Sequence, residues 1–299
     1  MPLPESQRFE ATLGKKPFLA TMEVNPPKGT DLSEVLKAVE GVKRFVDAIN
    51  VTDGSGAIMR ACALSVAKAV LDAGVDPVLQ MTCRDRNRLA LQADLLGASI
   101  FGIRNILLLT GDDPKAGDHP ETKPVFDLKS SELMQVAKGL TEGKDMAGKE
   151  LAGTPQFCIG AAADPGAKDL DVEMQKFQAK ITGGAQFFQT QAVFDPPALS
   201  RFMERAKTFG KPVLAGILLV KSAKMARYMN EHVWGIHVPE DLIARFEKTS
   251  DKRAECVAVT VELIRAVRET ANGIHLYGLG WEDLIPDILK DAKLEAARR

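Results

Sequence analysis

Eight short apolar segments alternate with longer helical stretches along almost the whole chain, and this alternation restricts the fold more than any other feature of the sequence. Most of the segments are near-continuous apolar runs, as expected of strands that are buried on both faces. The expected strands are Phe18–Val24, Val46–Thr52, Pro77–Cys83, Asn105–Thr110, Gln156–Ala161, Ala185–Ala192, Pro212–Leu218 and Ile274–Leu279.

Patterned stretches between these segments predict the helices. Several of them are followed by glycine, which can adopt the left-handed conformation that closes a helix. The expected helices are Leu32–Phe45, Ile58–Ala73, Arg86–Leu96, Ser130–Leu140, Leu170–Ile181, Pro197–Phe209, Glu255–Thr270 and Glu282–Ala297. The closing glycines are Gly74, Gly97, Gly183 and Gly210.

Strands that alternate with helices pair in parallel, because a parallel connection needs a crossover. Eight such units in about 250–300 residues are the size of a closed barrel. The sequence therefore predicts an α/β protein with a single (β/α)8 TIM barrel of parallel strands. We expect one catalytic domain over residues 1–299, with an N-terminal extension at 1–16 and the barrel at about 17–298.

An open doubly wound sheet is the main alternative. Such a sheet commonly carries a GxGxxG string after its first strand, and none follows the first strand here. Gly54-Ser55-Gly56 is a shorter string and follows the second strand. The segment Lys115–Lys129, after the fourth strand, has the composition of a mobile surface loop.

Composition narrows the class of protein. The hydrophobic share of 45% supports a core of useful size, and the net charge of −1 gives no basic footprint for nucleic acid. No apolar run of about 18 residues predicts a membrane span, and the N-terminus lacks a secretory pattern. The four cysteines are far apart and form no CxxC pair, so neither a disulfide framework nor a metal site is expected. A cytoplasmic protein without a bound metal is the resulting expectation.

Polar residues gather where the predicted strands end. Ligands of barrel enzymes meet the chain at the C-terminal ends of the strands and in the loops that follow. The residues at these positions are Glu23, Thr52, Gln80, Thr82, Thr110, Gly111, Asp112, Ala161, Ala163, Gln191 and Tyr277. We therefore expect an active site at this rim.

Several of these residues also have a purely structural interpretation. Glu23 could be a core acid paired with an arginine, because a buried carboxylate needs compensation. Asp112 stands in the turn-rich string GDDP, where aspartate commonly bonds to nearby backbone. Gln191 could satisfy backbone groups at a strand end, and Gly54 and Gly56 could form only a tight turn.

The functional interpretation assigns the two acids different tasks. A carboxylic acid can donate a proton near neutral pH where its surroundings favour the protonated form, and Glu23 is the candidate for this role. A carboxylate that stays ionised can stabilise a cationic intermediate, and Asp112 is the candidate there.

Seven strings in this order resemble the methylenetetrahydrofolate reductase family. Together they span about residues 17–290, and they are specific as a set although each is weak alone. They are TMEVNPP (21–27), NVTDGSG (50–56), LQMTCRD (79–85), RNILLLTGDDP (104–114), TQAVFD (190–195), GIL (216–218) and IHLYGL (274–279). The fold of this family is also a (β/α)8 barrel.

The resemblance implies a flavoprotein of one-carbon metabolism and methionine biosynthesis. Its FAD would accept electrons from NADH or NADPH and pass a hydride to 5,10-methylenetetrahydrofolate, giving 5-methyltetrahydrofolate. By position, Glu23 corresponds to the general acid and Asp112 to the carboxylate beside flavin and folate. Gln191 and Tyr277 fall among the substrate contacts. The positions implied for FAD are Thr52, Gln80, Thr82, Thr110, Gly111, Asp112, Ala161, Ala163 and Lys180.

The chain departs from the family pattern at several positions. Gln80 stands where histidine is frequent, Thr110 where an arginine is usual, and Ala223 where many members have an aromatic that stacks on the pterin. The string AAADPGAKDLD after the fifth strand lacks the usual tyrosine and histidine contacts to FAD. These departures bear more on the folate geometry and the electron donor than on the flavin.

Other functions remain open at this point. The chain could be a related oxidoreductase, or a reductase subunit that receives electrons from a partner protein. It could also be a folate-binding or methyl-transfer protein without redox chemistry, which would carry no flavin. A metal-dependent lyase is disfavoured, because the rim lacks a histidine and carboxylate ligand set. A homo-oligomer is possible, and the sequence does not choose between NADH and NADPH.

Overall fold

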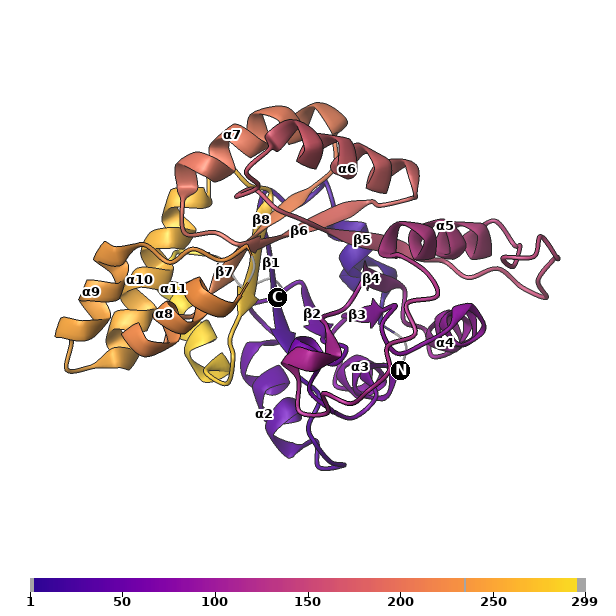
Figure 1. Ribbon diagram of the computed structural model, residues 1–299, viewed down its shortest axis with the longest axis horizontal. Coiled ribbons are helices and arrows are strands. Elements are labelled where there is room, and N and C mark those ends of the chain that lie inside the picture. Colours follow the sequence, from indigo (N-terminus) through magenta and orange to yellow (C-terminus); the bar gives the residue numbers. More distant parts are fainter. Residues whose placement is uncertain (1–2, 234, 295–299) are drawn as a thin grey trace.

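Eight parallel strands form a closed barrel in the computed structural model, which describes residues 3–233 and 235–294. Each strand pairs with the next one in sequence, and β8 pairs with β1 (Figure 1). The strands are Leu19–Val24 (β1), Ala48–Val51 (β2), Pro77–Thr82 (β3), Asn105–Leu109 (β4), Cys158–Ala163 (β5), Phe187–Ala192 (β6), Val213–Leu218 (β7) and Gly273–Tyr277 (β8). The predicted parallel (β/α)8 barrel is confirmed.

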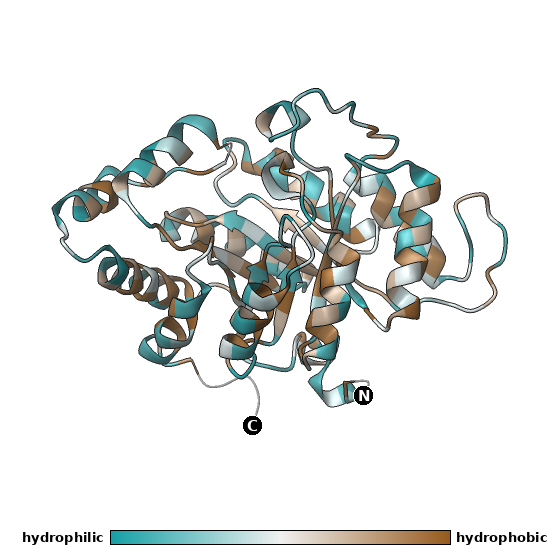
Figure 2. Cartoon of the chain, turned by 90° about the horizontal axis from the view of Figure 1, so that it is seen from below, coloured by the Kyte–Doolittle hydropathy of each residue, from teal (hydrophilic) through white to brown (hydrophobic). Residues whose placement is uncertain are grey.

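Helices surround the strands, and their hydrophilic residues predominate on the outer surface (Figure 2). The main helices are Ser33–Val42 (α2), Ala63–Asp72 (α3), Arg88–Ile100 (α4), Ser130–Thr141 (α5), Leu170–Thr182 (α6), Pro196–Ala206 (α7), Ala223–His232 (α8), Glu240–Lys248 (α9), Lys252–Val267 (α10) and Ile285–Asp291 (α11). Short turns include α1 (Phe9–Thr12), η2 (Ser55–Ala57) and η3 (Pro114–Ala116). No helix in the described ranges is long and apolar enough to cross a bilayer.

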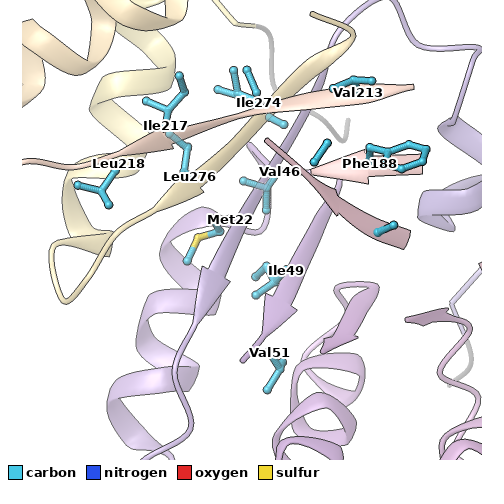
Figure 3. Close-up of a cluster of buried hydrophobic side chains, with 14 of the residues drawn as sticks. Met22, Val46, Ile49, Val51, Phe188, Val213, Ile217, Leu218, Ile274 and Leu276 are labelled. Atoms are coloured by element: carbon cyan, nitrogen blue, oxygen red, sulfur yellow. The ribbon is translucent and has the colours of Figure 1, made fainter. Parts of the chain in front are cut away.

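The hydrophobic core has two parts. The larger part lies between the strands and the surrounding helices, where Met22, Ile49 and Leu276 come from neighbouring strands (Figure 3). The smaller part contains Leu19, Val78, Leu214 and further residues near the N-terminal ends of the strands, together with Phe9 from outside the sheet. Side chains alternate along a strand, so the two parts occupy opposite faces of the barrel wall.

The N-terminal segment closes the floor of the barrel. The ring of Phe9 in α1 is fully buried and meets Phe187 edge-to-face, with 5.2 Å between the ring centroids. Beside it, Arg8 forms a buried ion pair with Asp76 at 2.9 Å. Asp76 also accepts a hydrogen bond from the Phe9 amide at 2.8 Å. The expected extension at 1–16 is thus part of the packed barrel over its described residues, which begin at residue 3.

The connection between β7 and β8 contains helices that the sequence did not indicate. α8 fully buries only Ala226, with Met225 and Met229 partly buried against the core, and α9 is short. Several helix ends also differ from the expectation. α4 continues through Gly97 to Ile100, and the left-handed residues are Gly102 after α4 and Gly184, rather than Gly183, after α6. The end of the expected last helix, residues 295–297, lies outside the described residues.

The segment Lys115–Lys129 is a largely exposed loop, and it forms bonds to the barrel in both of its halves. The Asp118 carboxylate pairs with Lys28 and accepts a hydrogen bond from the Met59 amide. Asp127 forms a two-point ion pair with Arg88, whose shorter bond is 2.8 Å. These bonds anchor both halves of the segment.

Candidate active site

A layer of polar side chains crosses the inside of the barrel above its apolar floor. Asn50 Nδ2 donates to Gln189 Oε1 over 2.7 Å, and Gln189 Nε2 donates back to Asn50 Oδ1 over 3.1 Å. Gln189 Nε2 also lies 3.2 Å from Thr21 Oγ1. Thr21 Oγ1 in turn contacts His275 Nδ1 at 2.9 Å. Because β2 and β6 are not neighbours in the sheet, these bonds must span the lumen.

Glu23 lies one strand step above this layer. It follows Thr21 by two residues, so both side chains point into the barrel, and it is 7% exposed. Its Oε2 atom is 3.8 Å from His275 Nε2. No hydrogen bond to the Glu23 carboxyl occurs within the described ranges, and the arginine partner of the structural interpretation is absent there. Glu23 is therefore a nearly buried carboxyl that remains free to bind a ligand.

Tyr277 completes this part of the rim. Its hydroxyl donates to the Thr190 carbonyl over 2.8 Å, and its ring meets His275 edge-to-face with 4.7 Å between the centroids. Burial raises the pKa of the Tyr277 phenol, and the nearby Glu23 charge raises it further. The phenol therefore stays protonated at neutral pH. A Cβ at Gly216 would lie 2.9 Å from the Tyr277 ring and 2.5 Å from the Thr190 carbonyl oxygen, so this position needs glycine.

The predicted site residues in and after β2 and β3 differ in whether their side chains already have hydrogen-bond partners. Thr52 Oγ1 donates to Asn25 Oδ1 over 2.8 Å. The amide and hydroxyl of Thr82 both donate to Asp53, which also binds Arg86. The Gln80 side chain, in contrast, has no hydrogen-bond partner in the described part of the chain and is 8% exposed. Its amide is available to a ligand.

The loop after β4 is connected to the loop after β2. Asp112 Oδ2 accepts a hydrogen bond from the Gly56 amide over 2.8 Å. Gly54 and Gly56 are both left-handed, so the tight turn considered for this string is real. Gly111 has a φ of 98°, and a Cβ there would lie 2.9 Å from Arg84 Cβ. Thr110 is exposed and lies 3.3 Å from the Ser130 hydroxyl.

The predicted positions on β5 and α6 are less accessible. The side chains of Ala161 and Ala163 are buried in the core between sheet and helices, so a cofactor could reach only their backbone. Ala162, between them, is partly exposed and faces the opposite way. Lys180 Nζ donates to the Ala162 carbonyl over 2.7 Å, and burial lowers its pKa.

Gln191 lies at the end of β6 and is half-buried. Its amide has no hydrogen-bond partner among residues 3–233 and 235–294. The loop between α8 and α9 passes nearby, since a Cβ on Gly235 would lie 3.8 Å from Gln191 Cγ. The structure thus brings Glu23, Tyr277 and Gln191 to one rim. No hydrogen bond or ion pair within the described ranges joins Asp112 to them.

A cavity of about 370 Å³ opens beside the linked loops after β2 and β4. Arg60, Arg84 and Arg86 line it together with Asp53 and Gly54. The Nε atom of Arg60 is buried and has no hydrogen-bond partner within the described residues. Arginine suits the phosphates of a nucleotide cofactor. No cluster of metal-ligating side chains is present in the described residues.

Sequence reasoning assigned no role to four residues of the polar layer, Thr21, Asn50, Gln189 and His275. A signal for them existed. Polar residues stand two apart at the ends of five strands, as in Thr21 and Glu23 or His275 and Tyr277, and this spacing points both side chains to the same face.

Comparison with known proteins supplies the identity of the fold family. The sequence model of the family described as methylenetetrahydrofolate reductase matches residues 8–293, nearly the whole chain. The chain belongs to the methylenetetrahydrofolate reductase family. The resemblance carried by the seven sequence strings is thereby confirmed.

Members of the reductase family align along most of this chain. A probable methylenetetrahydrofolate reductase (NADPH) of Caenorhabditis elegans is 26% identical over 318 residues, covering 98% of this chain and 45% of that protein. The 5,10-methylenetetrahydrofolate reductase of Escherichia coli is 23% identical, covering 87% of this chain and 85% of that protein. The chain thus spans about half the length or less of the eukaryotic relatives and most of the bacterial one.

A solved structure shares the barrel of the reductase family. It is an uncharacterized protein from Clostridium thermocellum that binds two copies of 5-methyl-5,6,7,8-tetrahydrofolic acid. Its TM-score is 0.64 at 16% identity, over 93% of this chain and 96% of that one. At this identity the likeness supports the fold alone.

Proposed function

We propose that the chain is an FAD-dependent enzyme that reduces 5,10-methylenetetrahydrofolate to 5-methyltetrahydrofolate with electrons from NADH or NADPH. Membership of the reductase family supports the reaction class. The observation that carries the proposal is Glu23, a carboxyl at the rim that is 7% exposed and has no hydrogen bond within the described ranges. Burying a carboxyl without a partner costs free energy, and a role in proton transfer explains why such a residue is present.

The residues at the rim fit a flavin nucleotide. The amides of Gln80 and Gln191 are free to bond to a ligand, and arginines line the cavity beside the loops after β2 and β4. The Arg60 side chain lines the same cavity and carries a positive charge that suits a phosphate. Thr52, Thr82, Thr110, Gly111, Ala161, Ala163 and Lys180 are the further positions proposed to surround FAD.

FAD, when bound, supplies the hydride transfer. The chain itself handles protons, charge and orientation. Glu23 donates a proton to the ring nitrogen of the folate whose C–N bond breaks, which opens the imidazolidine ring to an iminium ion. The Asp112 carboxylate stabilises that cation, and Gln191 and Tyr277 orient the folate.

A partner protein could replace the pyridine nucleotide as the electron donor. The curated eukaryotic relatives contain more than twice the length of chain that aligns here, so further segments or subunits are compatible with the family. A cytoplasmic location and a homo-oligomeric state remain part of the proposal.

An absorption spectrum of the purified protein, followed by anaerobic reduction, tests this function. We expect a flavin spectrum that NADH or NADPH bleaches and that 5,10-methylenetetrahydrofolate restores without oxygen. A flavin that neither nucleotide reduces, but that an added electron-transfer protein does, would point to the partner. A colourless protein that binds folate would contradict the redox proposal.

A further inference from the structure

A fully enclosed imidazole lies beside the proposed proton donor. His275 is 1% exposed, and its Nε2 atom is 3.8 Å from Glu23 Oε2. This distance is close to, but exceeds, that of a hydrogen bond. No other basic side chain pairs with Glu23 in the part of the chain that the structure describes.

The other ring nitrogen has its own partners. His275 Nδ1 lies 2.9 Å from Thr21 Oγ1 and 3.3 Å from Gln189 Nε2. The Gln189 amide is itself held by reciprocal bonds with Asn50, and Thr21 Oγ1 also lies 3.3 Å from the Ile274 carbonyl oxygen. When Nδ1 accepts from the Gln189 amide, the proton of the neutral ring is on Nε2, facing Glu23.

Few other ionisable groups face this carboxyl. On β8, Tyr277 is the second titratable neighbour, and its phenol is fixed on the Thr190 carbonyl. The neighbouring strand β2 contributes Asn50 and Thr52, which carry no charge. Among the described residues, His275 is therefore the main titratable group that can act on the Glu23 carboxyl.

We propose that His275 is a positioning residue for Glu23. Its Nε2–H directs the carboxyl toward the rim and stabilises the carboxylate that forms when the proton moves to the folate nitrogen. His275 keeps its own proton throughout, so the only proton transferred is that of Glu23. This inference rests on the proposed function, because it assigns Glu23 the role of acid.

Two substitutions of His275 separate the effect of its N–H donor from the effect of its ring shape. His275→Phe keeps a planar ring and removes the Nε2 donor, whereas His275→Gln retains an N–H donor. The rate at which 5,10-methylenetetrahydrofolate reoxidises the reduced flavin is measured in single turnovers from pH 6 to 9. The rate of flavin reduction by NAD(P)H is measured in parallel. Leu276→Val, on the helix-facing side of the same strand, is the matched control for a buried change.

We expect His275→Phe to slow the folate step by about tenfold or more, since a positioned acid contributes about 10²- to 10⁴-fold. The folate rate is expected to decrease as the pH rises. In His275→Phe this decrease should occur at higher pH, because the carboxylate has lost a stabilising donor. His275→Gln should recover part of the loss. Flavin reduction should change less than about twofold, and Leu276→Val should leave the pH profile in place.

A double variant makes the test decisive. In a Glu23→Gln background, His275→Phe should slow the folate step little further, because the carboxyl that His275 positions has already been removed. Full additivity, or equal slowing of both half-reactions with an unchanged pH profile, would overturn the inference. If His275→Phe does not yield flavin-loaded protein, His275→Asn carries the same expectations, since its side chain is too short to reach Glu23. A wild-type folate rate in Glu23→Gln alone would instead reject the proposed function.

Discussion

The Asp112 carboxylate at the end of β4 accepts a hydrogen bond from the Gly56 amide, with 2.8 Å between Oδ2 and the nitrogen. The bond joins the loops after two strands that are not neighbours in the barrel. Asp112 therefore orders the rim as well as carrying a negative charge there. These two contributions can be separated, because asparagine keeps an acceptor oxygen and loses the charge.

Asp112→Asn should preserve flavin content and reduction by NAD(P)H but slow folate reduction. Removing one stabilising group near a developing charge typically costs about 10²- to 10³-fold, and we expect an effect near the lower end because Asp112 is exposed. Asp112→Ala should also lose the bond to Gly56 and bind flavin more weakly. Rapid-mixing kinetics of both half-reactions check this, and unchanged folate kinetics in Asp112→Asn would reject the role of the charge.

Phe9→Ala should destabilise the barrel although residue 9 precedes the first strand. The ring is fully buried against Phe187, and truncating such a ring costs about 3–5 kcal/mol. Phe101→Ala, at a position that is 44% exposed, is the control and should cost much less. Urea unfolding curves measure the difference. Equal effects of the two substitutions would show that the N-terminal segment is not part of the core.

Gly216→Ala should disturb the rim through a single methyl group. The added Cβ would lie 2.5 Å from the Thr190 carbonyl oxygen, which is backbone and cannot move aside easily. We expect a lower Tm and loss of folate reduction as Tyr277 is displaced. Gly41→Ala in α2 meets nothing within 4 Å and should be neutral or slightly stabilising. A fully active, equally stable Gly216→Ala would contradict the geometry described for Tyr277.

The cysteines should react very differently with thiol reagents. Burial raises the pKa of the Cys83 and Cys256 thiols to about 11, and that of Cys158 also rises. These thiols stay protonated at pH 8, and the thiol form is unreactive. Cys62 is exposed. Titration with a chromogenic disulfide should modify one thiol quickly in the native protein and four in guanidinium chloride. Rapid modification of all four without denaturant would contradict the burial.

The strands of this fold were predictable because the barrel wall is apolar on its helix-facing side and near its floor, which gives continuous apolar runs such as NILLL in β4. The segments that connect the strands were harder to predict from the sequence. The sequence of α8 is rich in charged and polar residues, and only Ala226 among its apolar residues is fully buried. The bonds of the segment Lys115–Lys129 to Lys28 and Arg88 were not predictable, because these partners are distant in sequence.

The candidate site was predictable only in part. Strand-end position identifies Glu23, Gln191 and Tyr277, because all barrel strands end at one rim. Strand-end position does not show which face of the barrel wall a residue occupies. Ala161 and Ala163 were therefore predicted at the site, whereas their side chains lie in the core between the sheet and the helices. The contact between His275 and Glu23 depends on the pairing of β8 with β1, where His275 aligns with Thr21. Local sequence does not encode that register.

Replacement of Glu23 by glutamine gives the most direct test of the account. Glutamine keeps the size of the side chain and cannot donate the acidic proton. Anaerobic rapid mixing should show flavin content and reduction by NAD(P)H near the wild-type values, while reoxidation by 5,10-methylenetetrahydrofolate slows by about 10²-fold or more. Reoxidation at the wild-type rate would contradict the assignment of Glu23 as the acid.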